Sequence, residues 1–249
     1  MQKEIGWLLQ EKYNGKLTPA AKKDIKRLKS GEPLDHLIGF VEFLGCKILV
    51  DKNVLIPRFE TEFWVQEAID ELSSYKVNKV CKVLDMFAGS GAIGIAVLKH
   101  ARNTHTVCVF AESEKEAVAQ IKKNCDINKI PKSRYHIIQS DIFSNIQGRF
   151  DVIFANPPYI PTARKHKVQT SVLKYEPKEA LFGGPDGLSF VTRFLTEAKD
   201  FLSPGGKIYM EFDTMQRHKI NILLKKLRYK TWQFHKDQYG RFRWVAVAN

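Results

Sequence analysis

The chain has few cysteines and no apolar run long enough to cross a membrane. Its 249 residues include four cysteines, scattered with no pair at the spacing of metal ligands. We therefore expect reduced thiols and no metal site, as is usual in a cytosolic protein. No segment approaches the roughly 20 apolar residues of a membrane span, so we expect no membrane partner. The start of the chain lacks a basic region followed by an apolar segment, so we expect no signal peptide and a cytoplasmic location.

Internal repeats and low-complexity segments are also missing. With 44% hydrophobic residues, the chain can bury a full core, and we expect one main domain with an appendage. The net charge of +13 suits a polyanionic partner, but the basic residues are spread along the chain. The densest basic run, residues 22–29, fits either the solvated face of a helix or a contact surface for RNA or a ribosome-associated partner.

The first third of the chain predicts short helices and one hairpin. Residues 1–30 fit one or two helices, with Thr18 as an N-cap before a proline. Residues 37–50 alternate in polarity around a glycine and predict a β-hairpin. We expect Thr61 to cap a further helix with one apolar face.

From residue 80 onward, strands and helices alternate. We predict strands at 80–86, 106–112, 134–139, 150–155, 206–212, 229–235 and 241–248, and helices at 91–101, 114–127, 187–202 and 215–227. Such alternation predicts an α/β fold with a mostly parallel, Rossmann-like sheet of seven strands. The last strand must be antiparallel because its link to the preceding strand is short. A ligand is expected beyond the carboxyl ends of the strands.

The most informative stretch is residues 151–159, where an apolar strand stops at Asn156, two prolines and Tyr159. Proline forces the preceding residue into an extended conformation, which would hold Asn156 rigidly at the strand end. Its carboxamide oxygen and a nearby backbone carbonyl could accept the two hydrogens of a planar –NH2 group, with Tyr159 as a flat wall. The alternative is a proline-rich turn after a buried strand.

A glycine-rich loop follows the first strand of the alternating region. Gly89, Gly91 and Gly94 have dinucleotide-binding spacing, and Glu112 lies near the expected distance. Alone, this pattern fits a nicotinamide or flavin site. Asp85, however, would place a carboxylate at the mouth of the loop, where it repels a pyrophosphate and suits the cationic groups of S-adenosylmethionine.

Two further carboxylates follow neighbouring strands. Glu112 can accept both ribose hydroxyls. Asp141 is placed to meet the adenine amino group, although it could equally be a helix cap or turn residue.

Together these segments resemble the HemK/PrmC family of S-adenosylmethionine-dependent N5-glutamine methyltransferases, which modify peptide chain release factors. The similarity runs from about residue 26 and is carried by residues 31–34, 38–39, 56–62, 85–93, 141–143, 156–160, 175–177, 180–188, 204–206 and 236–243. The Asn-Pro-Pro-Tyr motif alone is shared with N6-adenine methyltransferases, whereas the segments at 57–58 and 176–188 are more particular to this family.

The resemblance implies a class I methyltransferase fold and the cofactor S-adenosylmethionine. It implies three units, namely a short N-terminal helical segment for substrate recognition (1–36), a β-hairpin linker (37–56) and a catalytic domain (57–249). We predict the catalytic residues Asn156, Pro157, Pro158 and Tyr159. We predict a cofactor site at Arg58, Thr61, Asp85, Phe87, Ala88, Gly89, Ser90, Gly91, Glu112, Asp141, Ile142 and Asn156. Arg58 and Thr61 could instead belong to a rigid loop, with Arg58 paired to Glu62.

The implied activity is N5-methylation of the glutamine in the Gly-Gly-Gln motif of a release factor, by an enzyme that we expect to be a monomer. The chain departs from the family at Phe87-Ala88, where Gly-Thr is usual, at Glu112, where Asp is usual, and at Phe59, where a second proline is common. Its N-terminal helical region is also shorter. The alternatives are a glutamine of another translation protein, such as a ribosomal protein, N6-adenine methylation of nucleic acid, and a non-catalytic adapter with the same fold.

Overall fold

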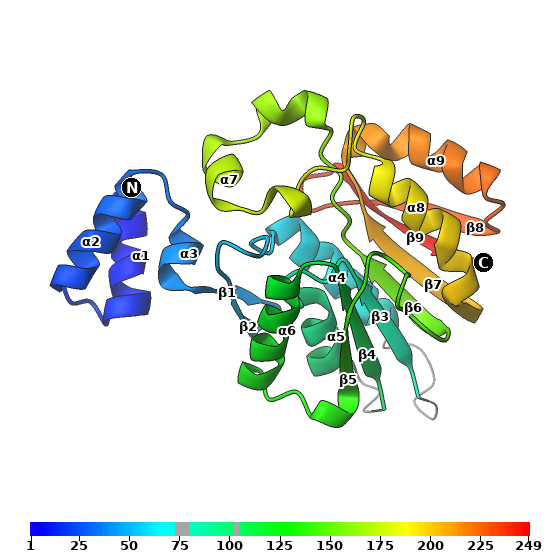
Figure 1. The fold of residues 1–249 in the computed structure, drawn as a ribbon, viewed down its shortest axis with the longest axis horizontal. Helices are drawn as coiled ribbons and strands as arrows, with labels where there is room; N and C mark the ends of the chain where they lie inside the picture. Colours follow the sequence, from blue (N-terminus) through cyan, green and yellow to red (C-terminus); the bar gives the residue numbers. More distant parts are fainter. Residues whose placement is uncertain (73–79, 102–104) are drawn as a thin grey trace.

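The computed structural model describes residues 1–72, 80–101 and 105–249. A seven-stranded sheet with the order β5-β4-β3-β6-β7-β9-β8 forms its centre (Figure 1). The strands are β3 (Lys82–Met86), β4 (Val107–Glu112), β5 (Tyr135–Gln139), β6 (Phe150–Ala155), β7 (Leu202–Glu211), β8 (Thr231–Lys236) and β9 (Phe242–Ala248). Strand β9 runs antiparallel to both of its neighbours, and the other adjacent pairs are parallel. The predicted sheet with an antiparallel last strand is confirmed.

Helices cover both faces of the sheet. Alternate residues of each strand point to opposite sides, so the strands contribute apolar side chains to two separate cores. Val83 belongs to one core cluster, with α4 (Phe59–Leu72), α5 (Ala92–His100) and α6 (Lys115–Ile127). Leu84 belongs to a second cluster, with α8 (Ser189–Glu197) and α9 (Arg217–Lys226). The arrangement leaves the carboxyl ends of the parallel strands as an edge on which a site can form.

Most predicted boundaries differ from the structure by one or two residues, and some by more. The helix expected at 187–202 is shorter, since α8 begins at Ser189 and gives way to a 3-10 turn at Ala198–Phe201. Gly187 has φ +78 and lies against the backbone oxygen of Tyr159, so it cannot be helical. Strand β7 begins at Leu202, earlier than predicted, with an irregular register before residue 207. Helix α9 begins at Arg217, after a 3-10 turn at Thr214–Gln216.

The prediction that Thr61 caps a helix is wrong. Helix α4 begins at Phe59, two residues earlier, so Thr61 lies inside its first turn and is 5% exposed. Its hydroxyl donates a 2.7 Å hydrogen bond to the carboxylate of Glu211 instead of capping the helix. A side chain that carries its own polar group into the core needs such a partner.

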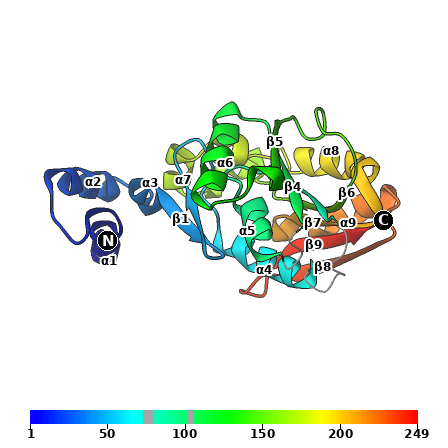
Figure 2. The same ribbon diagram turned by 90° about the horizontal axis from the view of Figure 1, so that it is seen from below.

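The N-terminal region forms three helices that lie apart from the sheet, at one end of the molecule in both views (Figures 1 and 2). They are α1 (Gln2–Tyr13), α2 (Pro19–Lys29) and α3 (Leu34–Ile38). As predicted, Thr18 caps α2, its hydroxyl accepting from the Ala21 N–H at 3.1 Å. Leu8, Leu28 and Leu37 make a small separate core.

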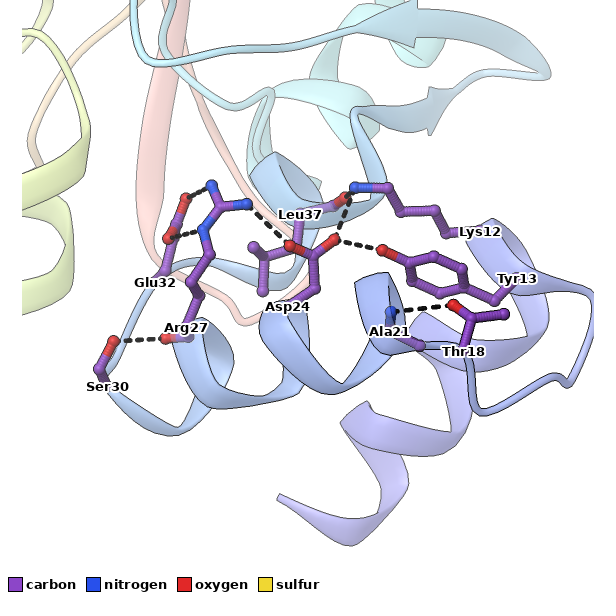
Figure 3. A network of polar contacts seen from close by, with 9 residues as sticks. All are labelled: Lys12, Tyr13, Thr18, Ala21, Asp24, Arg27, Ser30, Glu32 and Leu37. Carbon is purple, nitrogen blue, oxygen red and sulfur yellow. Dashed lines mark hydrogen bonds and ion pairs between the residues drawn. The ribbon is translucent and has the colours of Figure 1, made fainter.

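A buried carboxylate joins α1 to α2. Asp24 accepts hydrogen bonds from Lys12 (2.8 Å), Tyr13 (2.6 Å) and Arg27 (2.8 Å), as Figure 3 shows. The three donors and the local positive charge lower the pKa of Asp24 against the effect of burial. The lysines of the basic run lie on the opposite, exposed side of α2.

The predicted hairpin consists of β1 (Phe40–Phe43) and β2 (Cys46–Leu49). Two side-chain amides, one in α6 and one directly after it, hold the hairpin to the sheet domain. Asn124 accepts from the Leu49 N–H at 2.8 Å, and Asn128 accepts from the Lys47 N–H at 3.1 Å. Among the described residues, no helix is both long and apolar enough to span a membrane.

Candidate active site

Two cavities meet at the carboxyl edge of the sheet. The larger one, of about 470 Å³, lies over the glycine-rich loop, and the second, of about 410 Å³, lies under the segment that follows β6. Asn156 borders both cavities, together with Leu55, Arg58 and Ala180. A group held in one cavity can therefore react with a group held in the other across Asn156.

The loop between β3 and α5 forms the floor of the larger cavity, which the predicted residues Phe87, Ala88, Gly89 and Ser90 line. Gly91 begins the turn into α5 with φ +79, and a Cβ there would lie 3.1 Å from Ile121. Only glycine fits this close approach between loop and helix.

Two residues on the cavity wall have strained backbone conformations. Phe87 has φ 60 and Ile142 has φ 52, which is unfavourable for a bulky or β-branched residue. The Phe87 ring packs edge-on against Phe190, with 6.1 Å between the ring centroids. These apolar side chains make a wall suited to a planar aromatic ring.

Glu112 ends β4 beside the loop, as predicted. One carboxylate oxygen accepts from the Gly89 N–H at 2.7 Å, and the other accepts from the N–H groups of Ser113 (2.8 Å) and Glu114 (3.1 Å). The carboxylate is thus fixed on the cavity wall, and it still has lone pairs for ligand hydroxyls.

Asp85 does not stand at the mouth of the loop, and that prediction is wrong. It is fully buried, and its Oδ2 accepts from the Gly94 N–H in the first turn of α5 at 2.8 Å. Burial raises its pKa to about 8. Its Oδ1 has no hydrogen-bond partner within the described part of the chain. Asp85 therefore supports the loop from behind, and its contact with a cationic group stays a prediction.

Asp141 lies on the rim of the larger cavity. Both of its oxygens accept from the Arg193 guanidinium of α8, at 3.1 and 2.9 Å. The sequence analysis did not predict this partner. The pair joins the segment after β5 to α8 across the rim, where the carboxylate remains 61% exposed and open to a ligand.

The segment after β6 is held in place by its backbone. Pro157 and Pro158 are buried, and no described residue donates to the Pro157 carbonyl oxygen. Gln216 donates to the Tyr159 carbonyl at 2.9 Å and to the Gly187 carbonyl at 3.0 Å. A Cβ on Gly183 would lie 2.3 Å from the Pro158 oxygen. The segment that follows the motif, residues 160–187 (the insert), is thus packed tightly against it.

Beneath the motif lies Glu211, a residue that the sequence analysis missed. It is 1% exposed and accepts from Thr61 (2.7 Å), Trp64 (2.7 Å) and Tyr159 (2.9 Å). Burial raises the pKa of Glu211 above its usual value, although the three donors oppose this effect. The sequence does contain a signal for this residue. Glu211 directly follows the buried strand residues 208–210, and a carboxylate at such a position needs polar partners.

Arg58 pairs with Glu176 rather than with Glu62. The contact from the Arg58 guanidinium to the Glu176 carboxylate is 2.6 Å, and the Ile56 N–H donates to the other oxygen at 3.1 Å. The Glu176 side chain is 1% exposed. The pair ties the segment 160–187 to the segment before α4, and Arg58 borders both cavities. Glu62 accepts from the Leu44 N–H instead.

The larger cavity fits S-adenosylmethionine. Its volume lies in the range of small-molecule sites, Glu112 offers a carboxylate for ribose hydroxyls, and the Phe87 and Ile142 side chains offer an apolar wall for the base. No metal-binding group of three or more His, Cys, Asp or Glu residues occurs in the described ranges. The fold and this site define a class I S-adenosylmethionine-dependent methyltransferase.

Comparisons with known proteins support the class and narrow it. Residues 69–184 match the model of the Methyltransferase small domain. The release factor glutamine methyltransferase of Lactococcus lactis is 34% identical over 98% of this chain and 88% of its own length. That of Francisella tularensis is 36% identical over 86% of this chain and 73% of its own. The chain belongs to the release factor glutamine methyltransferase family.

Solved structures agree on the fold. The catalytic domain of hMettl16 superposes with a TM-score of 0.65 at 14% identity, covering 83% of this chain and 76% of its own. The T. thermophilus rRNA methyltransferase RsmC, solved with AdoMet and guanosine, gives a TM-score of 0.59 at 17% identity, covering 84% and 49%. At these identities the likeness extends to the fold alone.

Proposed function

We propose that this protein transfers a methyl group from S-adenosylmethionine to the side-chain nitrogen of the glutamine in the Gly-Gly-Gln motif of a peptide chain release factor. The observation that carries the proposal is the position of Asn156 between two cavities, one suited to the cofactor and the other open to a substrate side chain. The family relationship supplies the substrate class.

A glutamine amide is a poor nucleophile because its nitrogen lone pair is delocalised into the carbonyl. The Asn156 Oδ1 and the Pro157 carbonyl oxygen accept its two N–H hydrogens and fix the nitrogen toward the cofactor cavity. Tyr159 packs beside the amide plane. Bound S-adenosylmethionine supplies the methyl group on a sulfonium, which is a good leaving group. Positioning of this kind contributes roughly 7–11 kcal/mol of the barrier reduction, and fixed dipoles add to it.

The second cavity suits an extended protein segment. Besides Asn156 and Pro157, it is bordered by Ile160, Pro161 and Val172 of the insert. Charged side chains such as Arg164, Lys167 and Asp213 border the same cavity, so it offers both apolar contacts and polar groups that can orient a substrate side chain. We infer that the target glutamine enters here. A cytoplasmic location, a monomeric state and substrate recognition by the three N-terminal helices are further parts of the proposal.

The test is methyl transfer from labelled S-adenosylmethionine to three acceptors in parallel: a release factor, the same factor with the motif glutamine changed to Ala, and duplex DNA. We expect label on the intact factor alone. Label on DNA, or equal label on the Ala variant, would overturn the proposal. In the same assay Asn156→Ala should lower the rate by about 10²–10³, by analogy with loss of an oxyanion-hole donor, and near-normal turnover would remove Asn156 from its role.

A further inference from the structure

The proposed reaction requires one particular orientation of the Asn156 carboxamide. Its oxygen accepts hydrogen bonds and its –NH2 group donates them. Only the oxygen can receive the N–H of a substrate amide, and the reversed orientation would set donor against donor. The two orientations of a side-chain amide have the same shape, so the neighbouring hydrogen-bond partners must determine which one is adopted.

The first constraint on this orientation comes from Trp64, whose indole N–H can only donate a hydrogen bond. It donates to Oε2 of Glu211 at 2.7 Å, so Oε2 must act as an acceptor. This holds whether Glu211 is ionised or carries its proton on Oε1. The Thr61 hydroxyl also lies 2.7 Å from Oε2, and with no proton on Oε2 it gives its hydrogen to the same oxygen.

The chain of contacts continues to Asn156. With its hydrogen committed to Glu211, the Thr61 oxygen can only accept from its other neighbour. That neighbour is Asn156, whose Nδ2 lies 3.4 Å from the Thr61 Oγ1. Oδ1 is then directed away from Thr61, and Asn156 borders both cavities. Thr61 and Glu211 are both largely buried, so water cannot easily replace either partner.

We propose that Thr61 and Glu211 are positioning residues that fix the Asn156 carboxamide with its oxygen toward the acceptor amide. The inference rests on the proposed function. It assigns to Thr61 a role distinct from lining the cofactor cavity, although its side chain also borders that cavity.

The decisive comparison is Thr61→Val with Thr61→Ser. Valine keeps the shape of threonine but has no hydroxyl, so the Asn156 amide loses the acceptor that orients it. We expect kcat for the release factor to fall about tenfold, the effect of one lost hydrogen bond. The KM for S-adenosylmethionine should stay within about twofold. Thr61→Ser keeps the hydroxyl and should recover most of kcat.

A matched control is Thr196→Val. Thr196 is exposed on α8, and its hydroxyl bonds within its own helix, so the change should leave kcat unaltered. If Thr61→Val retains full kcat, the inference is wrong. If it raises the cofactor KM at unchanged kcat, Thr61 is a cofactor contact and the inference is also wrong.

Glu211→Leu provides a second route. If both residues act through Asn156, the double variant Thr61→Val/Glu211→Leu should lose little more kcat than the worse single variant. Additive losses would contradict a shared path. A melting curve establishes that each variant is folded, and if Glu211→Leu does not fold, the Thr61 comparison decides.

A readout without activity separates this inference from the proposed function. In ¹⁵N-labelled protein, the side-chain amide signals of Asn156, assigned through Asn156→Ala, should show faster hydrogen exchange in Thr61→Val than in wild type. Unchanged exchange would overturn the inference. If wild type labels no glutamine, the proposed function fails whatever the amide signals show.

Discussion

The hydroxyl of Tyr159 donates a 2.9 Å hydrogen bond to the carboxylate of Glu211, which lies 52 residues further along the chain. Tyr159 ends the Asn-Pro-Pro-Tyr motif, whereas Glu211 ends the neighbouring strand β7. The bond makes Tyr159 more than a flat wall, because it fixes the ring from the side opposite the backbone. Burial and the charge of Glu211 raise the pKa of Tyr159 well above its usual value, so the hydroxyl stays protonated and remains a donor.

Replacing Tyr159 by Phe keeps the ring and removes this bond. We expect the melting temperature to fall by roughly 2–4 °C, because a buried oxygen of Glu211 loses a donor. We also expect a several-fold loss of kcat, because the ring is less firmly placed. Calorimetry and steady-state kinetics measure the two effects. Tyr239→Phe is the control, since Tyr239 is 64% exposed, and a fall in melting temperature as large as that of Tyr159→Phe would contradict the assignment.

The buried carboxyl of Asp85 should make stability depend on pH. Its folded-state pKa of about 8 lies above the ordinary value of 3.8. Between about pH 4 and pH 8, the folded state holds a proton that the unfolded state has lost, so this group's contribution to stability falls as pH rises. Asp85→Asn cannot titrate.

The melting temperature of Asp85→Asn relative to wild type should therefore rise from pH 5 to pH 8 and level off above that. All other titrations are shared by the two proteins and cancel in the difference. Parallel melting curves across this range would show that Asp85 is ionised in the folded state at all these pH values.

Gly94 is required by packing between α5 and the sheet. A Cβ there would lie 2.3 Å from the Phe110 ring and 2.9 Å from the Cys108 sulfur. Gly94→Ala should lower the free energy of unfolding by about 1–3 kcal/mol, the usual cost of overpacking. Gly6→Ala is the matched control, because Gly6 lies in helix α1 with open space around its Cα. That change should be neutral or stabilising, and denaturant titration of both variants tests the contrast.

Asp141 and Arg193 should affect cofactor binding more than stability. Their ion pair is exposed, and such pairs contribute about 0–1 kcal/mol. Asp141→Ala removes the carboxylate proposed to meet the adenine amino group. We expect the Kd for S-adenosylmethionine to rise about tenfold or more, with little change in melting temperature. Isothermal titration calorimetry measures the affinity, and an unchanged Kd would leave Asp141 with a structural role only.

The sequence alone determined the order of the seven sheet strands and of the longer helices between them, because period and turn residues are local signals. It missed the short helices at Leu34–Ile38 and Thr170–Tyr175. The sequence also located the two segments that form the candidate active site, namely the glycine-rich loop and the Asn-Pro-Pro-Tyr motif. The glycine spacing of residues 89–94 and the prolines after Asn156 restrict the backbone locally, and both lie where the pattern predicts, at the ends of parallel strands.

Only the tertiary structure decided which side chains face a ligand and which are buried partners. Thr61 has the local features of a helix cap, yet its hydroxyl bonds Glu211, 150 residues away. Asp85 has the place of a cofactor ligand, yet it supports α5 from behind the loop. Arg58 has a near acidic neighbour, yet it pairs with Glu176. Each outcome depends on which polar groups lie next to one another in the packed core, where an unpaired polar atom is costly. Spacing along the chain does not predict these pairings.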